Sequence, residues 1–303
     1  MTNGPTLLVD ASSLIYRAFF STPDTVRAPD GTLVNAAHGF LGMLARLIDD
    51  HDPQRICCAA DEDWRPEWRV RLIHTYKTHR TEPSSVQQQA DSQLAAQMPV
   101  IFRLLELCGI KVVGHAGYEA EDVIGTLAAR SSGPVAIVSG DRDLFQLVRD
   151  PDVFVLYPKR GVSVVDRVDE AYIEEHFGIP GRAYRDYAVL RGDTSDGLPG
   201  VRGIGAKIAA SLLERYGSLS VIMSAATTGG QGIALTRVRR DLDYLGRALQ
   251  VVTIATELPL PEVDLTRPRE APDEAVYPLA GRYGLTNAMG RLIASLGSHR
   301  DGT

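Results

Sequence analysis

The sequence predicts an α/β fold with a mostly parallel central sheet and helices on both faces. Two observations lead to this prediction. Short apolar runs, rich in β-branched residues and bounded by turn residues, recur through the first half of the chain. Longer segments with the apolar spacing of amphipathic helices lie between them. Such alternation is typical of parallel sheets whose strands are buried on both faces.

Five segments of the first half are expected to be strands, and three to be helices. The strands are Leu7–Asp10, Arg55–Asp61, Ile110–Val113, Pro134–Ser139 and Val153–Tyr157. The helices are Ala36–Asp50, Met98–Cys108 and Glu119–Arg130. The second of these helices stops at Gly109, a residue type that commonly ends helices.

The second half of the chain is expected to be mainly helical. Helices are predicted over Asp169–Phe177, Arg182–Arg191 and near Arg237–Val252, and Leu198–Gly217 reads as a glycine-rich turn between helices. We therefore expect a core over residues 1–168, a helical region over 169–258 and an appendage over 259–303. Residues 62–97 form an insertion in the core that is long for a connection between sheet elements, which favours a functional role.

Composition narrows the class of protein. With 303 residues, 44% hydrophobic and 23% charged, the chain is typical of globular proteins. No apolar run reaches the ~18 residues of a membrane span, and the N-terminus lacks the pattern of a signal peptide, so a cytoplasmic location without membrane contact is expected. The three cysteines, Cys57, Cys58 and Cys108, lack zinc-site spacing and are expected to be buried thiols.

Three predicted strands are followed by aspartate. Asp10 ends the first, Asp61 ends the second, and Asp141 and Asp143 come just after the fourth. Because the carboxyl ends of parallel strands share one edge of a sheet, these side chains are expected to meet in one crevice.

Two further acidic segments are expected to join this crevice. Glu119, Glu121 and Asp122 open a predicted helix, and Asp193 and Asp196 precede the glycine-rich turn. Each acid alone could simply be a favourable partner of a helix dipole. Nine acids together would repel one another unless hard divalent cations bound them. The absence of a His/Cys set favours Mg²⁺ or Mn²⁺, and two or three such ions would suit phosphodiester hydrolysis.

The overall charge is compatible with a nucleic-acid substrate. The net charge of −6 argues against a general nucleic-acid coat protein. Setting aside the nine clustered acids leaves 29 acidic residues against 32 Lys and Arg, a mildly basic remainder.

Two segments are expected to contact a phosphate backbone. In Gly200–Lys207 (GVRGIGAK), small residues such as Gly203 and Gly205 let phosphate approach, and Lys207 can bind it; the alternative is a plain turn between helices. In the insertion, cations alternate with aromatic residues such as Tyr76, which suits phosphate contact and base stacking; the alternative is a solvated loop.

These motifs together resemble the flap endonuclease / 5′–3′ exonuclease family, which includes the N-terminal domain of bacterial DNA polymerase I. The resemblance spans about residues 7–258, through LLVDASSLIYRAFF, EWRVRLIHTYKTHR, GYEAEDV, SGDRDLFQLV and LRGDTSDGLPGVRGIGAKIAASLL. No polymerase domain follows, so the stand-alone form is expected. The family usually has aspartate where this chain has Glu121.

The resemblance implies a PIN-like nuclease core with a helical arch over about residues 62–97 and a helix–three-turn–helix over about 198–213. It implies that Arg69, Lys77 and Arg80 assist the scissile phosphate and that the nine acids are metal ligands. It also implies a K⁺ held by backbone carbonyls of Val201 and Ile204, and DNA contacts from Tyr16 and Arg17.

The implied substrate is branched, nicked or 5′-flap DNA, and no obligate protein partner is implied. The expected activity is 5′ flap endonuclease and 5′–3′ exonuclease cleavage in replication and repair. The alternatives are a PIN-like ribonuclease, a non-catalytic protein that binds branched DNA, and a phosphatase that uses Asp141 and Asp143.

Overall fold

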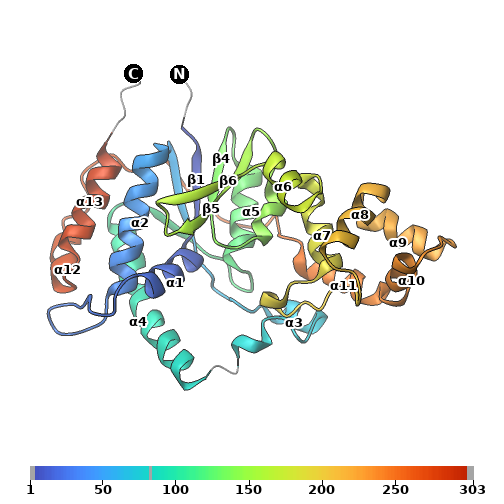
Figure 1. Cartoon of the computed structure of the whole chain (residues 1–303). Helices are drawn as coiled ribbons and strands as arrows, with labels where there is room; N and C mark the ends of the chain where they lie inside the picture. Colours follow the sequence, from blue (N-terminus) through green and yellow to red (C-terminus); the bar gives the residue numbers. More distant parts are fainter. Residues whose placement is uncertain (1–3, 82–83, 299–303) are drawn as a thin grey trace.

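The computed structural model describes residues 4–81 and 84–298, and it has one six-stranded sheet in the order β3-β2-β1-β4-β5-β6 (Figure 1). Neighbouring strands are parallel except for β5 and β6, which are antiparallel. The strands are β1 (Thr6–Asp10), β2 (Arg55–Ala59), β3 (Lys111–Val113), β4 (Val135–Val138), β5 (Val153–Arg160) and β6 (Val164–Val168). The five predicted strands are confirmed. Strand β6 was not predicted because it lies at the sheet edge, is mostly not buried and contains polar residues.

Helices cover both faces of the sheet, as expected. Leu7 and Val9 of β1 pack in one apolar cluster with α1 (Ala11–Ser21) and α2 (Asn35–His51). Leu8 points the other way, into the cluster that contains α5 (Ala120–Arg130). Because the central strands are buried on both faces, they read in sequence as uninterrupted apolar runs.

The insertion contains more helix than the sequence predicts. Helix α3 (Glu67–Leu72) lies near α7 (Tyr184–Arg191) and α11 (Leu242–Val252), and α4 (Ser85–Leu107) projects from the body near α1 (Figure 1). The prediction began α4 at Met98, which is 13 residues too late. Its first half contains helix-forming Gln and Ala but few buried apolar residues, so it lacks the periodic pattern that marks a packed helix.

The helical region forms the end of the molecule farthest from the C-terminal helices (Figure 1). It contains α6 (Glu170–Phe177), α7 (Tyr184–Arg191), α8 (Ala206–Tyr216), α9 (Leu219–Thr227), α10 (Ile233–Arg240) and α11 (Leu242–Val252). The single helix expected near residues 237–252 is thus two helices, which meet at Asp241. No helix among the described residues is long and apolar enough to cross a membrane.

The last part of the chain returns to the core. Helices α12 (Val276–Arg282) and α13 (Thr286–Gly297) join the apolar cluster of α2. Arg267, which is only 2% exposed, connects this region to the core. Its guanidinium donates to the carbonyls of Leu296 and Ser298 at the end of α13 and pairs with Asp52 at 2.6 Å. The segment expected to be an appendage is therefore anchored by buried polar contacts.

Candidate active site

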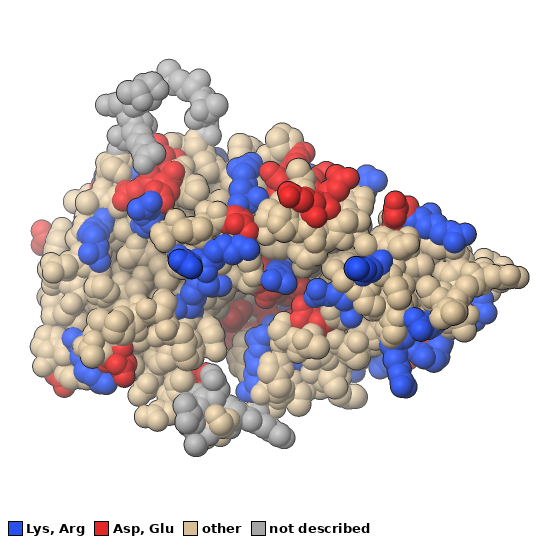
Figure 2. Space-filling model, in the orientation of Figure 1, with Lys and Arg blue, Asp and Glu red and all other residues tan. Residues whose placement is uncertain are grey.

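The candidate site lies at the edge of the sheet where the parallel strands end. The strand order reverses between β1 and β4, because β2 and β3 lie on one side of β1 and β4, β5 and β6 on the other. Ligand sites of open α/β sheets form at such a reversal. Figure 2 shows a hollow in one face, with acidic residues inside it and Lys and Arg around it.

Asp10 is the most enclosed of the strand-terminal acids. It ends β1, is 6% exposed and accepts hydrogen bonds from the backbone N–H of Ser13 (3.0 Å) and from Ser139 Oγ (2.6 Å). Burial, together with the charge of Asp61, raises the pKa of Asp10 to about 7. This carboxylate is therefore costly to ionise unless a cation binds nearby.

Three more aspartates follow β2 and β4, the two strands that flank β1. Asp61 accepts from the backbone N–H of Ala120 at 2.7 Å, and Asp141 accepts from that of Asp143 at 2.9 Å. Burial and the charge of Asp141 raise the pKa of Asp143 well above its usual value. Within the described part of the chain, none of Asp10, Asp61, Asp141 and Asp143 pairs with Lys or Arg. Their negative charge is left for an external cation.

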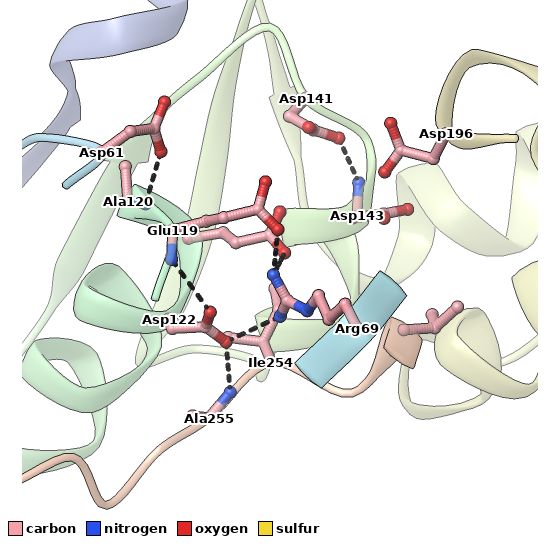
Figure 3. Close-up of polar contacts among 12 residues, drawn as sticks. Asp61, Arg69, Glu119, Ala120, Asp122, Asp141, Asp143, Asp196, Ile254 and Ala255 are labelled. Atoms are coloured by element: carbon pink, nitrogen blue, oxygen red, sulfur yellow. Dashed lines mark hydrogen bonds and ion pairs between the residues drawn. The ribbon is translucent and has the colours of Figure 1, made fainter. Parts of the chain in front are cut away.

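The acids that open α5 have a cation of their own. Figure 3 shows the Arg69 guanidinium directed at these carboxylates. Arg69 has no exposed surface and pairs with Glu119, with Glu121 at 3.0 Å and with Asp122 at 2.9 Å. Its guanidinium also lies 5.0 Å from the centre of the Trp68 ring. One arginine thus neutralises part of a buried carboxylate trio.

Asp122 is held entirely by protein groups. It is 0% exposed; Oδ1 accepts from Arg69 and from the backbone N–H of Ala255 (2.9 Å), and Oδ2 accepts from the backbone N–H of Glu119 (3.3 Å). Burial raises its pKa despite these contacts. In this arrangement Asp122 anchors the start of α5 and does not face the hollow as an open metal ligand.

The structure places Arg69 and Tyr76 inside the protein, away from the positions expected for contacts with DNA. The buried Arg69 cannot contact a scissile phosphate in this arrangement, because three carboxylates surround it. Tyr76 is 2% exposed and donates its hydroxyl to Glu119 at 2.6 Å, so its ring cannot stack on a base. Lys77 is also buried, with its ammonium on Glu119. Of the three cations expected at the phosphate, only Arg80 is substantially exposed, at 44% of its side chain.

The loop before the glycine-rich turn brings in the last two acids. Asp193 is the N-cap of a short 3₁₀ helix (Thr194–Asp196), and Asp196 is 5% exposed and pairs with Arg80 at 3.2 Å. Burial raises the pKa of Asp196 to about 6. Figure 3 shows Asp196 facing Asp141 and Asp143, although the loop is far from them in sequence. The structure thus gathers the predicted acids at one edge.

The donor set fits hard divalent cations, although the side chains are not yet arranged around one. The acids offer only carboxylate oxygens, which suit Mg²⁺ and Mn²⁺. Among the residues that the structure describes, no three such groups already form a ligand shell.

The glycine-rich turn is open on one side and covered on the other. A Cβ at Gly205 would meet nothing within 4 Å, and Lys207 is exposed, so phosphate can approach here. Gly203 instead lies under Arg237, whose guanidinium donates to its carbonyl at 2.6 Å. The carbonyl of Val201 accepts from the N–H of Ile204 at 2.8 Å.

The two DNA contacts expected on α1 lie beside the hollow. Tyr16 is 48% exposed and its ring packs 4.7 Å from that of Phe20, which is 56% exposed. Arg17 lies against Gly140, next to Asp141. Sequence reasoning missed Phe20, although a four-residue spacing from Tyr16 places two side chains on one face of any helix.

Sequence reasoning also missed the polar groups that hold the acids. Ser139 is fully buried and joins two strand ends, since its hydroxyl donates to Asp10 and accepts from the backbone N–H of Asp141 at 2.9 Å. Ser12 accepts from the backbone N–H of Asp61 at 3.1 Å. The only signal was the presence of serines beside the strand-terminal acids.

Comparison with known families identifies this arrangement. Residues 5–178 match the 5′–3′ exonuclease N-terminal resolvase-like domain, and residues 179–274 match the 5′–3′ exonuclease C-terminal SAM fold. The chain belongs to the 5′–3′ exonuclease family. The strand-edge carboxylates lie in the first of these domains, and Asp193, Asp196 and the glycine-rich turn lie in the second.

Relatives in the family extend over the whole chain. A 5′–3′ exonuclease of Streptomyces coelicolor is 46% identical over 96% of this chain and 99% of that protein. One of Mycobacterium tuberculosis is 41% identical over 96% of this chain and 98% of that protein. DNA polymerase I of Mycobacterium bovis is 37% identical over 84% of this chain but only 28% of that longer protein.

Solved structures share the fold. A flap endonuclease of bacteriophage T5, in a complex with DNA and metal ions, has a TM-score of 0.69 at 16% identity and covers 97% of this exonuclease chain and 100% of that one. Human GEN1 in complex with Holliday junction DNA has a TM-score of 0.60 at 17% identity, over 99% of this chain and 76% of that one.

Proposed function

We propose that this 5′–3′ exonuclease cleaves 5′-flap, nicked and branched DNA with the help of Mg²⁺ or Mn²⁺, in replication and repair. The observation that carries the proposal is a row of strand-end carboxylates that have no basic partner among residues 4–81 and 84–298: Asp10, Asp61, Asp141 and Asp143. These four, with Glu119, Asp193 and Asp196, would hold two or three ions. When bound, the ions supply activated water and neutralise charge on the phosphate.

The remaining steps fall to this chain's own residues. The open side of the turn, at Gly205 and Lys207, would bind the duplex backbone without reading sequence. Arg80, exposed beside Asp196, would hold the scissile phosphate in place. Tyr16 offers an exposed ring on which an unpaired base can stack. A K⁺ on the carbonyls of Val201 and Ile204 would complete the duplex contact, because a carbonyl has a second lone pair beyond its first hydrogen bond.

Glu121 is longer by one methylene than the aspartate usual at this position. It is 8% exposed, pairs with Arg69, and burial raises its pKa well above the usual value. We propose that Glu121 balances Arg69 as much as it binds an ion. The ion count would then be set mainly by the carboxylates that lack a basic partner.

The test is cleavage of a 5′-labelled flap DNA with Mg²⁺ or Mn²⁺ by the native protein, the Asp10→Asn variant and the exposed control Asp24→Asn. We expect cutting near the junction by the native and control proteins, and loss of cutting with retained DNA binding in Asp10→Asn. Binding without cutting by the native protein would instead support a non-catalytic DNA-binding protein. Preference for an RNA flap would support a ribonuclease, and hydrolysis of small phosphomonoesters a phosphatase.

A further inference from the structure

Lys77 connects the two halves of the acidic site. Its backbone N–H donates to the carbonyl of Asp196 at 3.0 Å, and its ammonium reaches across to Glu119. The backbone adopts the left-handed conformation (φ 49°), which is uncommon for a residue other than glycine. The chain therefore holds this lysine in an inward position that its own backbone does not favour.

Both carboxylate oxygens of Glu119 accept hydrogen bonds from neighbouring side chains. Its Oε2 accepts from Arg69 and from the Tyr76 hydroxyl, and its Oε1 accepts from Lys77. Of these partners, Arg69 is completely enclosed and bonds two further carboxylates. Lys77 makes its ion pair with Glu119 alone and keeps 6% of its side chain exposed. The lysine can therefore leave while Arg69 keeps its contacts with all three carboxylates.

We propose that Lys77 and a divalent ion compete for Glu119. In the ion-free protein the ammonium neutralises this carboxylate, and ion binding releases the ammonium toward the hollow, where it can bind a phosphate of the substrate. Arg69 stays in place in both states as a permanent counter-charge. The consequence is an order of events, since Lys77 becomes available to DNA only after the ion is bound. This inference rests on the ion dependence proposed above.

The amine itself gives a direct readout. The chain has four lysines, Lys77, Lys111, Lys159 and Lys207, and all but Lys77 are exposed. Reductive methylation followed by peptide mass spectrometry therefore has three internal standards. We expect slow methylation of Lys77 in EDTA and a clear increase with MgCl₂, while the other three lysines react alike in both conditions.

Ion affinity gives a second, independent readout. Lys77→Met leaves Glu119 partly uncompensated, so the variant should bind Mg²⁺ about tenfold more tightly in calorimetry, within the usual range of coupling between two sites. Arg17→Met is the matched control, because Arg17 lies beside Asp141 but forms no ion pair with a described acid. This control reports the effect of removing a nearby positive charge that does not compete for Glu119. Its gain in Mg²⁺ affinity should be smaller than that of Lys77→Met.

The outcomes separate the two proposals. Rapid methylation of Lys77 in EDTA would overturn the competition. So would a methylation rate of Lys77 that stays the same when Mg²⁺ is bound. Either result would leave the ion-dependent nuclease intact. Equal Mg²⁺ affinity in Lys77→Met and the native protein would also overturn it. If the native protein bound no Mg²⁺ or Mn²⁺ in calorimetry, the proposed function would fail, and the competition with it.

Discussion

Replacing Asp10 by asparagine should stabilise the ion-free protein at alkaline pH. The pKa of Asp10 is raised from 3.8 to about 7 by burial and by Asp61. Between these values the folded protein keeps a proton that the unfolded chain has lost, so native stability falls as pH rises and levels off above pH 7. A shift of about three units corresponds to about 4 kcal/mol, and the nearly complete burial of Asp10 leaves little solvent screening to reduce it.

The asparagine variant should escape this loss. Its side-chain oxygen can still accept from Ser13, and its amide can donate to Ser139. We expect a gain over the native protein of up to about 4 kcal/mol at pH 8, and of about 1 kcal/mol at pH 4.5. Urea unfolding in EDTA at both pH values measures this difference, and the exposed Asp24→Asn should show no gain at either.

Adding Mg²⁺ should narrow the difference in stability between the variant and the native protein. Free ion at 100 times its dissociation constant stabilises a binding protein by about 2.7 kcal/mol, and a variant that cannot bind gains nothing. The reasoning is refuted if Asp10→Asn is less stable than the native protein at pH 8 in EDTA. A gain of the same size at pH 4.5 and pH 8 would refute it too, because the effect would then not come from ionisation.

Three further predictions follow from the contacts described. Arg267→Met should lower the free energy of unfolding in urea by about 3–5 kcal/mol, because it leaves Asp52 and the end of α13 without their partner. Arg269→Met, at an exposed arginine, should lower it little, and equal losses in the two variants would contradict this. Gly197→Ala should cost at least about 2 kcal/mol and weaken cleavage, since its Cβ would lie 1.9 Å from the Thr75 carbonyl oxygen at a φ of +71°; an unchanged melting temperature would argue against that close contact. Mg²⁺ affinity measured by calorimetry should rise from pH 6 to pH 8 as Asp10 loses its proton, and an affinity independent of pH would contradict the raised pKa.

The location of the site could be predicted because its main groups follow directly from the strands. In an apolar run that ends in aspartate, such as LLVD before α1, the predicted strand and the acid are adjacent in the sequence. The parallel sheet then brings Asp10, Asp61 and Asp141 to one edge whatever the intervening chain does. This step needs no knowledge of side-chain packing.

The internal balance of charge could not be predicted in the same way. Arg69 and Glu119 are 50 residues apart, and their pairing depends on how the insertion folds back on α5. Nothing in a basic, aromatic segment shows which cations turn inward, so Arg69 and Tyr76 were predicted to face DNA. Arg267 gave no signal, because most of its partners are backbone carbonyls that every residue carries, and its carboxylate partner Asp52 lies 215 residues away.

The structure of α4 has a mechanical consequence. The helix is 23 residues long and contains Pro99, which lacks the N–H that would bond to the carbonyl of Ala95. Beyond it Ile101, Leu104 and Leu105 are completely buried, whereas residues 88–96 are exposed or half-buried. The C-terminal part of α4 is thus fixed in the core, and the missing hydrogen bond at Pro99 lies next to this fixed part. A bend of about 10° at Pro99 would move the start of the helix, about 21 Å away, by about 4 Å, so a small rotation next to the core becomes a large displacement at the far end of α4.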